Sequence, residues 1–201
     1  MNSKNKNIVI NSIGILFLIL GIGAIINTIY CDCGYAPILW ICYIALVLIG
    51  IGALRKDDLL VMSQLNILAI PLVVWSVDFF YILITGGSLL GVADYFFLPG
   101  PIISKIITTQ HLFTIPLGIY LLYLIKIKNK KAWSVSIIEV GVLFFASRFF
   151  TLPSENVNCA YYSCANFSLP IYYPLVWFAS YFAMIFLVNF VLMRVRILKE
   201  N

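Results

Sequence analysis

Charged side chains are scarce in this sequence: they make up 10% of its 201 residues, whereas hydrophobic side chains make up 63%. A water-soluble domain has roughly 25% charged residues, so this chain has too few of them to cover a surface that faces water. The mean hydropathy of +1.03 favours lipid as the solvent of most of the chain. Because the basic residues gather in short segments, we interpret the net charge of +5 as a sign of membrane topology and expect no nucleic-acid partner.

Histidine is nearly absent, and His111 is the single one. A catalytic zinc ion usually takes three protein ligands among which histidine predominates, so this scarcity excludes the multi-histidine zinc hydrolases. The sequence also has no Walker A motif, no G-x-G-x-x-G and no G-x-S-x-G. The usual nucleotide-binding and serine-hydrolase designs therefore lack support, and we expect neither a metal ion nor a cofactor.

Long apolar runs dominate what is present. A helix crosses about 30 Å of hydrocarbon with about 20 residues, and continuous runs favour helices over the alternating strands of a barrel. The sequence predicts an all-α membrane protein, a six-helix transmembrane bundle in one domain. Its spans are predicted at residues 8–30, 37–54, 59–83, 102–125, 132–152 and 171–193. The first run is longer than a signal-peptide core and no cleavage site follows it, so we interpret it as a membrane helix.

Lysine and arginine residues are segregated. Except for Lys105 and Arg148, all of them lie beside the same ends of the predicted helices. Because cytoplasmic loops are enriched in these residues, we predict that both termini are cytoplasmic and that the protein lies in the cell membrane. The outer side then carries residues 31–36, 84–101 and 153–170.

Two further segments bear on the architecture. Residues 88–97 are apolar but short, so a re-entrant or interfacial segment remains open and a seventh span is disfavoured. The segment Leu20–Ala24 is echoed by Ile49–Ala53, with glycine at the same two positions. Inverted repeats occur in transporters, but we interpret this echo as small residues that let two helices pack closely.

Four of the five cysteines lie in predicted outer loops, and Cys42 lies inside the second span. Disulfides persist in an oxidising compartment. A Cys-x-Cys pair closes a very tight ring, so we predict bonds between the two loops that tie them together. These bonds would run from Cys31 or Cys33 to Cys159 or Cys164.

Two cysteine pairs on two outer loops resemble the layout of the DsbB-type and vitamin-K-epoxide-reductase-type thiol oxidases, which are linked to quinones. The resemblance implies thiol-redox chemistry. Those families carry a Cys-x-x-Cys active pair, whereas this chain has Cys31-Asp32-Cys33 and Cys159-x4-Cys164. Thiol redox therefore stands as an alternative function.

Three ionisable residues inside the spans are candidate site residues: Asp78, His111 and Glu139. An aspartate at the centre of a membrane helix costs about 2.5–3.5 kcal/mol, so such residues often have a role. From their depths we predict an ion pair of Asp78 with Arg148 or Lys105. We also predict a hydrogen bond between His111 and Glu139 across the bundle.

The segment Gln110-His111-Leu112-Phe113-Thr114-Ile115-Pro116 resembles the androgen-induced-gene family of six-helix membrane hydrolases. The resemblance implies that His111 acts with a threonine nucleophile embedded in the membrane. The predicted second span contains no threonine or serine, so only His111 has a counterpart in that family.

The leading hypothesis is a membrane-embedded enzyme that acts on a lipid-like substrate, with membrane lipids as partners. His111 would serve as general acid or base, oriented by Asp78 or Glu139. The alternatives are a thiol-redox protein, a non-catalytic membrane assembly subunit, and a transporter. The transporter would be lined by Gln64, Asn66, Asp78, His111 and Glu139.

Overall fold

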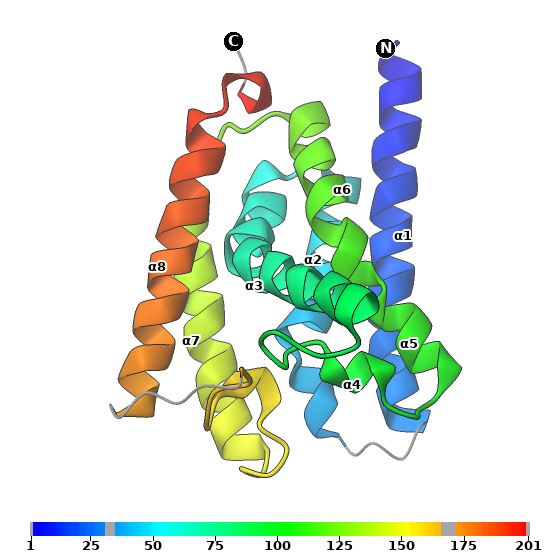
Figure 1. Ribbon diagram of the computed structural model, residues 1–201. Helices are drawn as coiled ribbons and strands as arrows, with labels where there is room; N and C mark the ends of the chain where they lie inside the picture. The colour runs from blue at the N-terminus through cyan, green and yellow to red at the C-terminus, as the bar shows by residue number, and fades with distance from the viewer. Residues whose placement is uncertain (1, 31–34, 166–171, 200–201) are drawn as a thin grey trace.

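The computed structural model describes residues 2–30, 35–165 and 172–199, and this part of the chain is helical (Figure 1). Its only β-pairing is an isolated bridge between Ile127 and Lys199. The helices are α1 (Ser3–Tyr30), η1 (Ala36–Leu39), α2 (Ile41–Arg55), α3 (Asp58–Thr85), α4 (Asp94–Phe97), α5 (Ile102–Thr108), α6 (Gln110–Ile125), α7 (Ala132–Phe150), η2 (Val157–Cys159), α8 (Tyr173–Arg194) and η3 (Arg196–Leu198).

The long helices match the predicted spans closely. Within the described residues, α1, α3, α5 together with α6, α7 and α8 are long and apolar enough to cross a membrane. Helix α2 has 15 residues, roughly 22 Å, because the short helix η1 and the non-helical Trp40 (φ −58°, ψ 122°) interrupt the run before it. The fold is that of a multi-pass membrane protein with five helices of spanning length and one shorter apolar helix.

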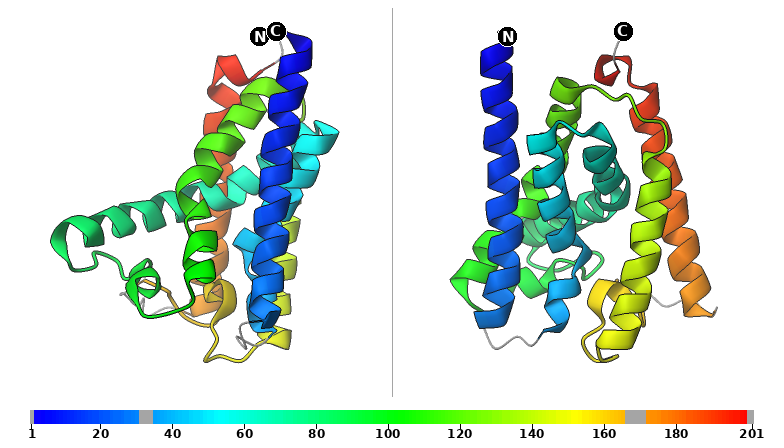
Figure 2. Two further views of the ribbon diagram at one scale, coloured as in Figure 1. Left: turned by 90° about the vertical axis from the view of Figure 1, so that its right-hand side faces the viewer. Right: turned by 180° about the vertical axis from the view of Figure 1, so that it is seen from behind.

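Helix α3 is the centre of the bundle. It packs against α2, α6, α7 and α8, and every residue from Val61 to Leu68 is buried. It runs at a steep angle to α1, α6 and α8, so that its C-terminal half projects from the bundle (Figure 2, left). The polar side chains of its first half therefore lie in the middle of the protein.

Both ends of the chain lie at the same end of the bundle, together with the connection between α6 and α7 (Figure 1). Lys126 Nζ donates to Ile197 O at 2.7 Å, and the backbone N–H of Ile127 donates to Leu198 O at 2.7 Å. Asp58 accepts hydrogen bonds of 2.7 Å from the backbone N–H groups of Lys128 and Asn129. These contacts bring two of the basic segments together, as the sequence predicts.

Glycines allow α1 and α2 to approach closely. A Cβ atom added at Gly50 would lie 2.7 Å from Leu18 Cγ and 2.9 Å from the carbonyl oxygen of Gly14. One added at Gly21 would lie 2.8 Å from Val47 Cγ2. The interpretation of the repeated segment as small packing residues is confirmed for Gly21 and Gly50, whereas nothing lies within 4 Å of a Cβ added at Gly23.

The fourth predicted span bends at Thr109, where α5 ends and α6 begins. Thr108 Oγ1 donates to Ser104 O at 2.8 Å and Thr109 Oγ1 donates to Ile106 O at 2.6 Å, and such bonds to preceding carbonyls often bend helices. Residues 88–97 form a loop and the one-turn helix α4 instead of a seventh span.

Candidate functional site

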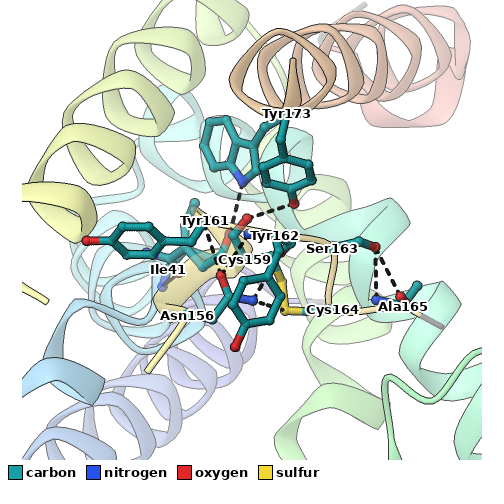
Figure 3. The surroundings of a disulfide bond; sticks show 11 residues. Ile41, Asn156, Cys159, Tyr161, Tyr162, Ser163, Cys164, Ala165 and Tyr173 are labelled. Carbon is teal, nitrogen blue, oxygen red and sulfur yellow. Dashed lines mark hydrogen bonds between the residues drawn. A yellow bond between two sulfur atoms is a disulfide. The ribbon is translucent and has the colours of Figure 1, made fainter. Parts of the chain in front are cut away.

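The two cysteines of the third outer loop are bonded to each other. Cys159 and Cys164 form a disulfide with an S–S distance of 2.04 Å (Figure 3). Asn158 and Cys159 have positive φ values of 56° and 53°, which curl the chain and bring the two Cα atoms to 5.5 Å. The predicted bonds from these cysteines to the first loop are therefore wrong, and Cys31 and Cys33 lie outside the described residues.

Asn158 fixes this loop to the helices. Its Oδ1 accepts from Ile41 N at 2.8 Å, and its Nδ2 donates to Leu39 O at 2.8 Å and to Ser147 Oγ at 3.0 Å. Trp177 Nε1 donates to its carbonyl oxygen at 3.0 Å. The disulfide is thus on a rigid platform built from α2, α7 and α8. Sequence reasoning missed Asn158, because an asparagine in a loop carries no signal of such burial.

Asp78 anchors a loop. Its carboxylate accepts hydrogen bonds from the backbone N–H groups of Leu89 at 2.9 Å, Leu90 at 2.8 Å and Ala93 at 2.9 Å. The predicted ion pair with Arg148 or Lys105 is wrong. The loop after α3 folds back onto Asp78 and supplies three backbone N–H donors that are close to it in sequence.

The two basic residues proposed as partners of Asp78 lie elsewhere. Arg148 is exposed, and its guanidinium carbon lies 4.9 Å from the ring centroid of Tyr161. The guanidinium also donates to the carbonyl oxygen of Ala160 at 3.3 Å. Lys105 belongs to α5 and forms no ion pair within the described part of the chain.

His111 packs into an aromatic cluster. Its ring centroid lies 4.7 Å from that of Trp75 at an interplanar angle of 57°, and Trp75 in turn packs on Phe79 and Phe96. His111 Nδ1 and Trp75 Nε1 are both buried without a hydrogen-bond partner in the described part of the chain. The aromatic rings hold His111 against α3, and the residues that surround it are mainly apolar.

Glu139 lies in a different place from His111. Its Oε2 accepts a hydrogen bond of 2.6 Å from Gln64 Nε2, whereas His111 contacts Trp75. Gln64 and Trp75 are separated by 11 residues of α3, about 16 Å along the helix axis. The predicted hydrogen bond between His111 and Glu139 is therefore wrong. Glu139 lies apart from the other two candidate residues, whereas His111 packs on Trp75 and Asp78 binds Ala93 of the same cluster.

Glu139 belongs to a polar cluster that joins α3, α7 and α8. Asn66 Nδ2 donates to Ser136 Oγ at 3.4 Å and to Asn189 Oδ1 at 3.3 Å, and Ser136 Oγ donates to the carbonyl oxygen of Ser63 at 2.9 Å. The members of the polar cluster are Ser63, Gln64, Asn66, Ser136, Glu139 and Asn189. Sequence reasoning missed Ser136 and Asn189. Each is a neutral polar residue within an apolar span, and that pattern could have indicated them as members of a polar cluster.

An apolar groove lies beside the polar cluster, between α2 and α7. Its volume is about 380 Å³, and seen from behind, α2 and α7 flank the first half of α3 (Figure 2, right). Ile138 and Val142 on its rim are 67% and 62% exposed, so the groove opens on the surface that faces lipid. We call it the α2–α7 groove; it is lined by Ile44, Leu48, Val135, Ile138, Glu139, Val142 and Leu143.

No protein-family model matches this chain, and no characterised protein and no solved structure shows significant similarity to it. The arrangement of its own side chains is therefore what bears on its function. In the α2–α7 groove an apolar concavity and an ionisable side chain, Glu139, coincide.

Proposed function

We propose that this chain is a multi-pass protein of the cell membrane that binds a lipid-like molecule in the α2–α7 groove. The observation that supports the proposal is an apolar cavity of about 380 Å³ whose wall includes the side chain of Glu139. Ligand sites are mostly apolar concavities of roughly 300–1,000 Å³ with a few placed polar groups. A groove bounded by exposed aliphatic side chains of α7 is entered from the bilayer, where lipid-like molecules are concentrated.

The positions of the three ionisable residues support binding better than they support catalysis. A general acid or base needs its partners within hydrogen-bond reach, and Asp78 is committed to three backbone donors. His111 lies against Trp75, well separated from Glu139. Glu139, by contrast, lines the α2–α7 groove.

The proposal includes six membrane crossings with both termini in the cytoplasm. It is supported by the position of the two termini at one end of the bundle, beside the lysine-rich connection between α6 and α7 (Figure 1). Enrichment of lysine and arginine on the cytoplasmic side is the general rule for short loops.

Photo-crosslinking tests the binding site. The full-length protein, in membranes that contain a fatty-chain lipid probe with a diazirine near the middle of the chain, is irradiated and digested. We expect crosslinked peptides to come mainly from α2 and α7, with adducts on or beside Leu48 and Val142. Adducts spread evenly over all lipid-facing helices would contradict the proposal.

A pair of tryptophan variants supplies the control. Leu48 is half-buried in the groove wall, so Leu48→Trp should fill the groove and remove most of the labelling. Leu187 is 56% exposed on α8 and lies outside the groove, so Leu187→Trp adds the same indole to another lipid-facing surface. Equal labelling of the two variants would argue against a specific site.

A second candidate function is thiol–disulfide exchange at the outer loop, and one observation favours it. Cys164 is exposed and is bonded within its own loop to Cys159, so an external dithiol can reach the bond. The dithiol would be oxidised to a disulfide while Cys159 and Cys164 become thiols.

Titration of this disulfide against mixtures of oxidised and reduced dithiothreitol, followed by thiol alkylation, tests that candidate. A redox-active bond should be reduced while the protein stays folded. Unfolding of the protein together with reduction would instead identify a structural bond.

A further inference from the structure

The polar cluster beneath the α2–α7 groove has acceptors without donors. Gln64 Oε1, Asn66 Oδ1 and Glu139 Oε1 are buried and have no hydrogen-bond partner in the described part of the chain. Gln64 and Asn66 are both 0% exposed. An unpaired buried acceptor is costly, and three of them in one cluster are unusual because most buried polar groups in folded proteins are paired.

The donors of the same side chains are already in use. Gln64 Nε2 donates to Ser63 Oγ at 3.1 Å and to Glu139 Oε2 at 2.6 Å. Asn66 Nδ2 donates to Ser136 and Asn189, and the single hydroxyl hydrogen of Ser136 is shared by the carbonyl oxygens of Ser63 and Ala132, each 2.9 Å away. With these donors in use and Glu139 ionised, Gln64, Asn66 and Ser136 leave the remaining acceptors of the cluster unpaired.

Positive charge is also missing near Glu139. Glu139 forms no ion pair with any described residue, and its one protein donor is the neutral amide of Gln64. Arg148 on the same helix is nine residues further on, roughly 13 Å along the axis, and packs on Tyr161. A carboxylate buried in a membrane is ordinarily paired, and a bound cation would supply the partner that the described residues lack.

We propose that the molecule in the α2–α7 groove is an amphiphile with a protonated primary amine on an apolar chain. This inference rests on the binding function proposed above and specifies its ligand class. An ammonium group carries three donors, no acceptor and one positive charge, which complements three unpaired acceptors, one of them on a carboxyl group. The chain lies along the aliphatic wall of the groove, and the ammonium group approaches Glu139, the member of the polar cluster that lines the groove.

Competition against the crosslinking probe tests the ligand class. The full-length protein is reconstituted in neutral lipid nanodiscs with the diazirine probe, and dodecylamine, dodecanol or dodecanoate is added. We expect dodecylamine to displace the probe at concentrations at least about tenfold lower than dodecanol, a difference that one buried ion pair can supply. Dodecanoate should be the weakest competitor. Equal displacement by all three would overturn the proposed ligand class.

Two glutamate variants show whether the preference depends on Glu139. Glu139→Gln should raise the dodecylamine concentration needed for displacement by about tenfold and leave that of dodecanol nearly unchanged, which also shows that the variant is folded. Glu155→Gln is the matched control, because Glu155 is an exposed carboxylate in the outer loop. An equal loss in both variants would indicate surface charge and overturn the assignment to Glu139.

A fourth competitor separates charge from hydrogen bonding. Dodecyltrimethylammonium carries the charge but no N–H donor, so we expect it to compete less well than dodecylamine; equal competition would overturn the hydrogen-bond match. Failure of the binding function itself looks different, because the probe would then not label α2 and α7 at all.

Discussion

Gln64 on α3 donates a hydrogen bond of 2.6 Å to Glu139 on α7. Within the described residues this is the one hydrogen bond that the carboxyl group receives, and its other oxygen has no partner. The contact joins the central helix to a helix that borders the α2–α7 groove. A substitution of Glu139 therefore also removes a hydrogen bond of the polar cluster.

Replacing Gln64 with leucine should destabilise the protein by about 1–3 kcal/mol, because it leaves a buried carboxyl group without its donor. The double variant Gln64→Leu/Glu139→Leu should recover part of this loss, since both polar partners are then removed. Unfolding by sodium dodecyl sulfate in mixed micelles measures the difference. Gln110→Leu is the matched control, because Gln110 is equally buried but has no carboxylate partner. A double variant less stable than Gln64→Leu would contradict the interpretation.

Replacing Asp78 with asparagine should loosen the loop after α3. The amide offers one acceptor oxygen in place of two and turns N–H donors toward backbone N–H groups. Hydrogen bonds to a charged group contribute about 1.5–3 kcal/mol; we therefore expect the amides of Leu89, Leu90 and Ala93 to exchange roughly 10–100-fold faster.

Hydrogen–deuterium exchange with mass spectrometry on residues 86–97 provides the measurement for Asp78→Asn. Asp94→Asn is the control, because Asp94 is exposed and accepts from Ser88 Oγ at 3.3 Å. If the loop exchanged at the rate of the unmodified protein, Asp78 would not be its anchor.

Alanine at Gly50 should separate α1 from α2. The added methyl group would lie within 3 Å of Leu18 and of the backbone of Gly14, and overpacking of this kind typically costs about 1–3 kcal/mol. Gly23→Ala is the matched control on α1, where nothing lies within 4 Å of the new Cβ. Thermal unfolding in detergent should show a lower melting temperature for Gly50→Ala alone; similar values for both variants would refute the close packing.

Epitopes inserted into two different loops should be accessible to antibody from opposite sides of the membrane. An epitope after Ser154 lies in the outer loop that carries the disulfide, and one after Lys130 lies in the basic connection between α6 and α7. We expect antibody to reach the first in intact cells and the second only after permeabilisation, because lysine-rich loops stay in the cytoplasm. The reverse pattern would invert the proposed orientation.

Removal of the Cys159–Cys164 bond should have a modest effect. The closed loop is short, and chain entropy assigns such a ring about 2 kcal/mol. Mass spectrometry of unreduced digests of the full-length protein should show the bond within one loop peptide, and Cys159→Ser/Cys164→Ser should lower the free energy of unfolding by no more than that amount. A crosslink between the first and third outer loops would contradict the pairing.

Hydropathy predicted the helices well because it is a local property of the chain. The ends of α1, α3, α7 and α8 lie within a few residues of the predicted ends, since a helix in lipid must satisfy its own backbone. The second run was predicted as one span, but a short helix at Ala36–Leu39, with Pro37 in its first turn, precedes it and Trp40 breaks the run. Proline and backbone torsions of this kind modify a span without changing its hydropathy.

The partners of the polar residues were predicted poorly. Depth and helical periodicity suggested a pair of His111 with Glu139 and a pair of Asp78 with a basic residue. These estimates assumed upright helices, whereas α3 is steeply inclined (Figure 2, left) and carries Gln64 to Glu139 and Trp75 to His111. Inclination and rotation come from the packing of all the helices against one another, which a single span does not encode.

Composition and the order of residues were thus sufficient for the membrane class, the approximate spans and the collection of basic residues at one end, because each follows from the transfer of short segments between water and lipid. Only the tertiary structure decided that Asp78 accepts hydrogen bonds from the amides of its loop, that Cys159 bonds to Cys164, and that Glu139 lies beside a groove. Those contacts depend on atoms brought within a few ångströms by helix packing and loop curvature, and hydropathy carries no information on either.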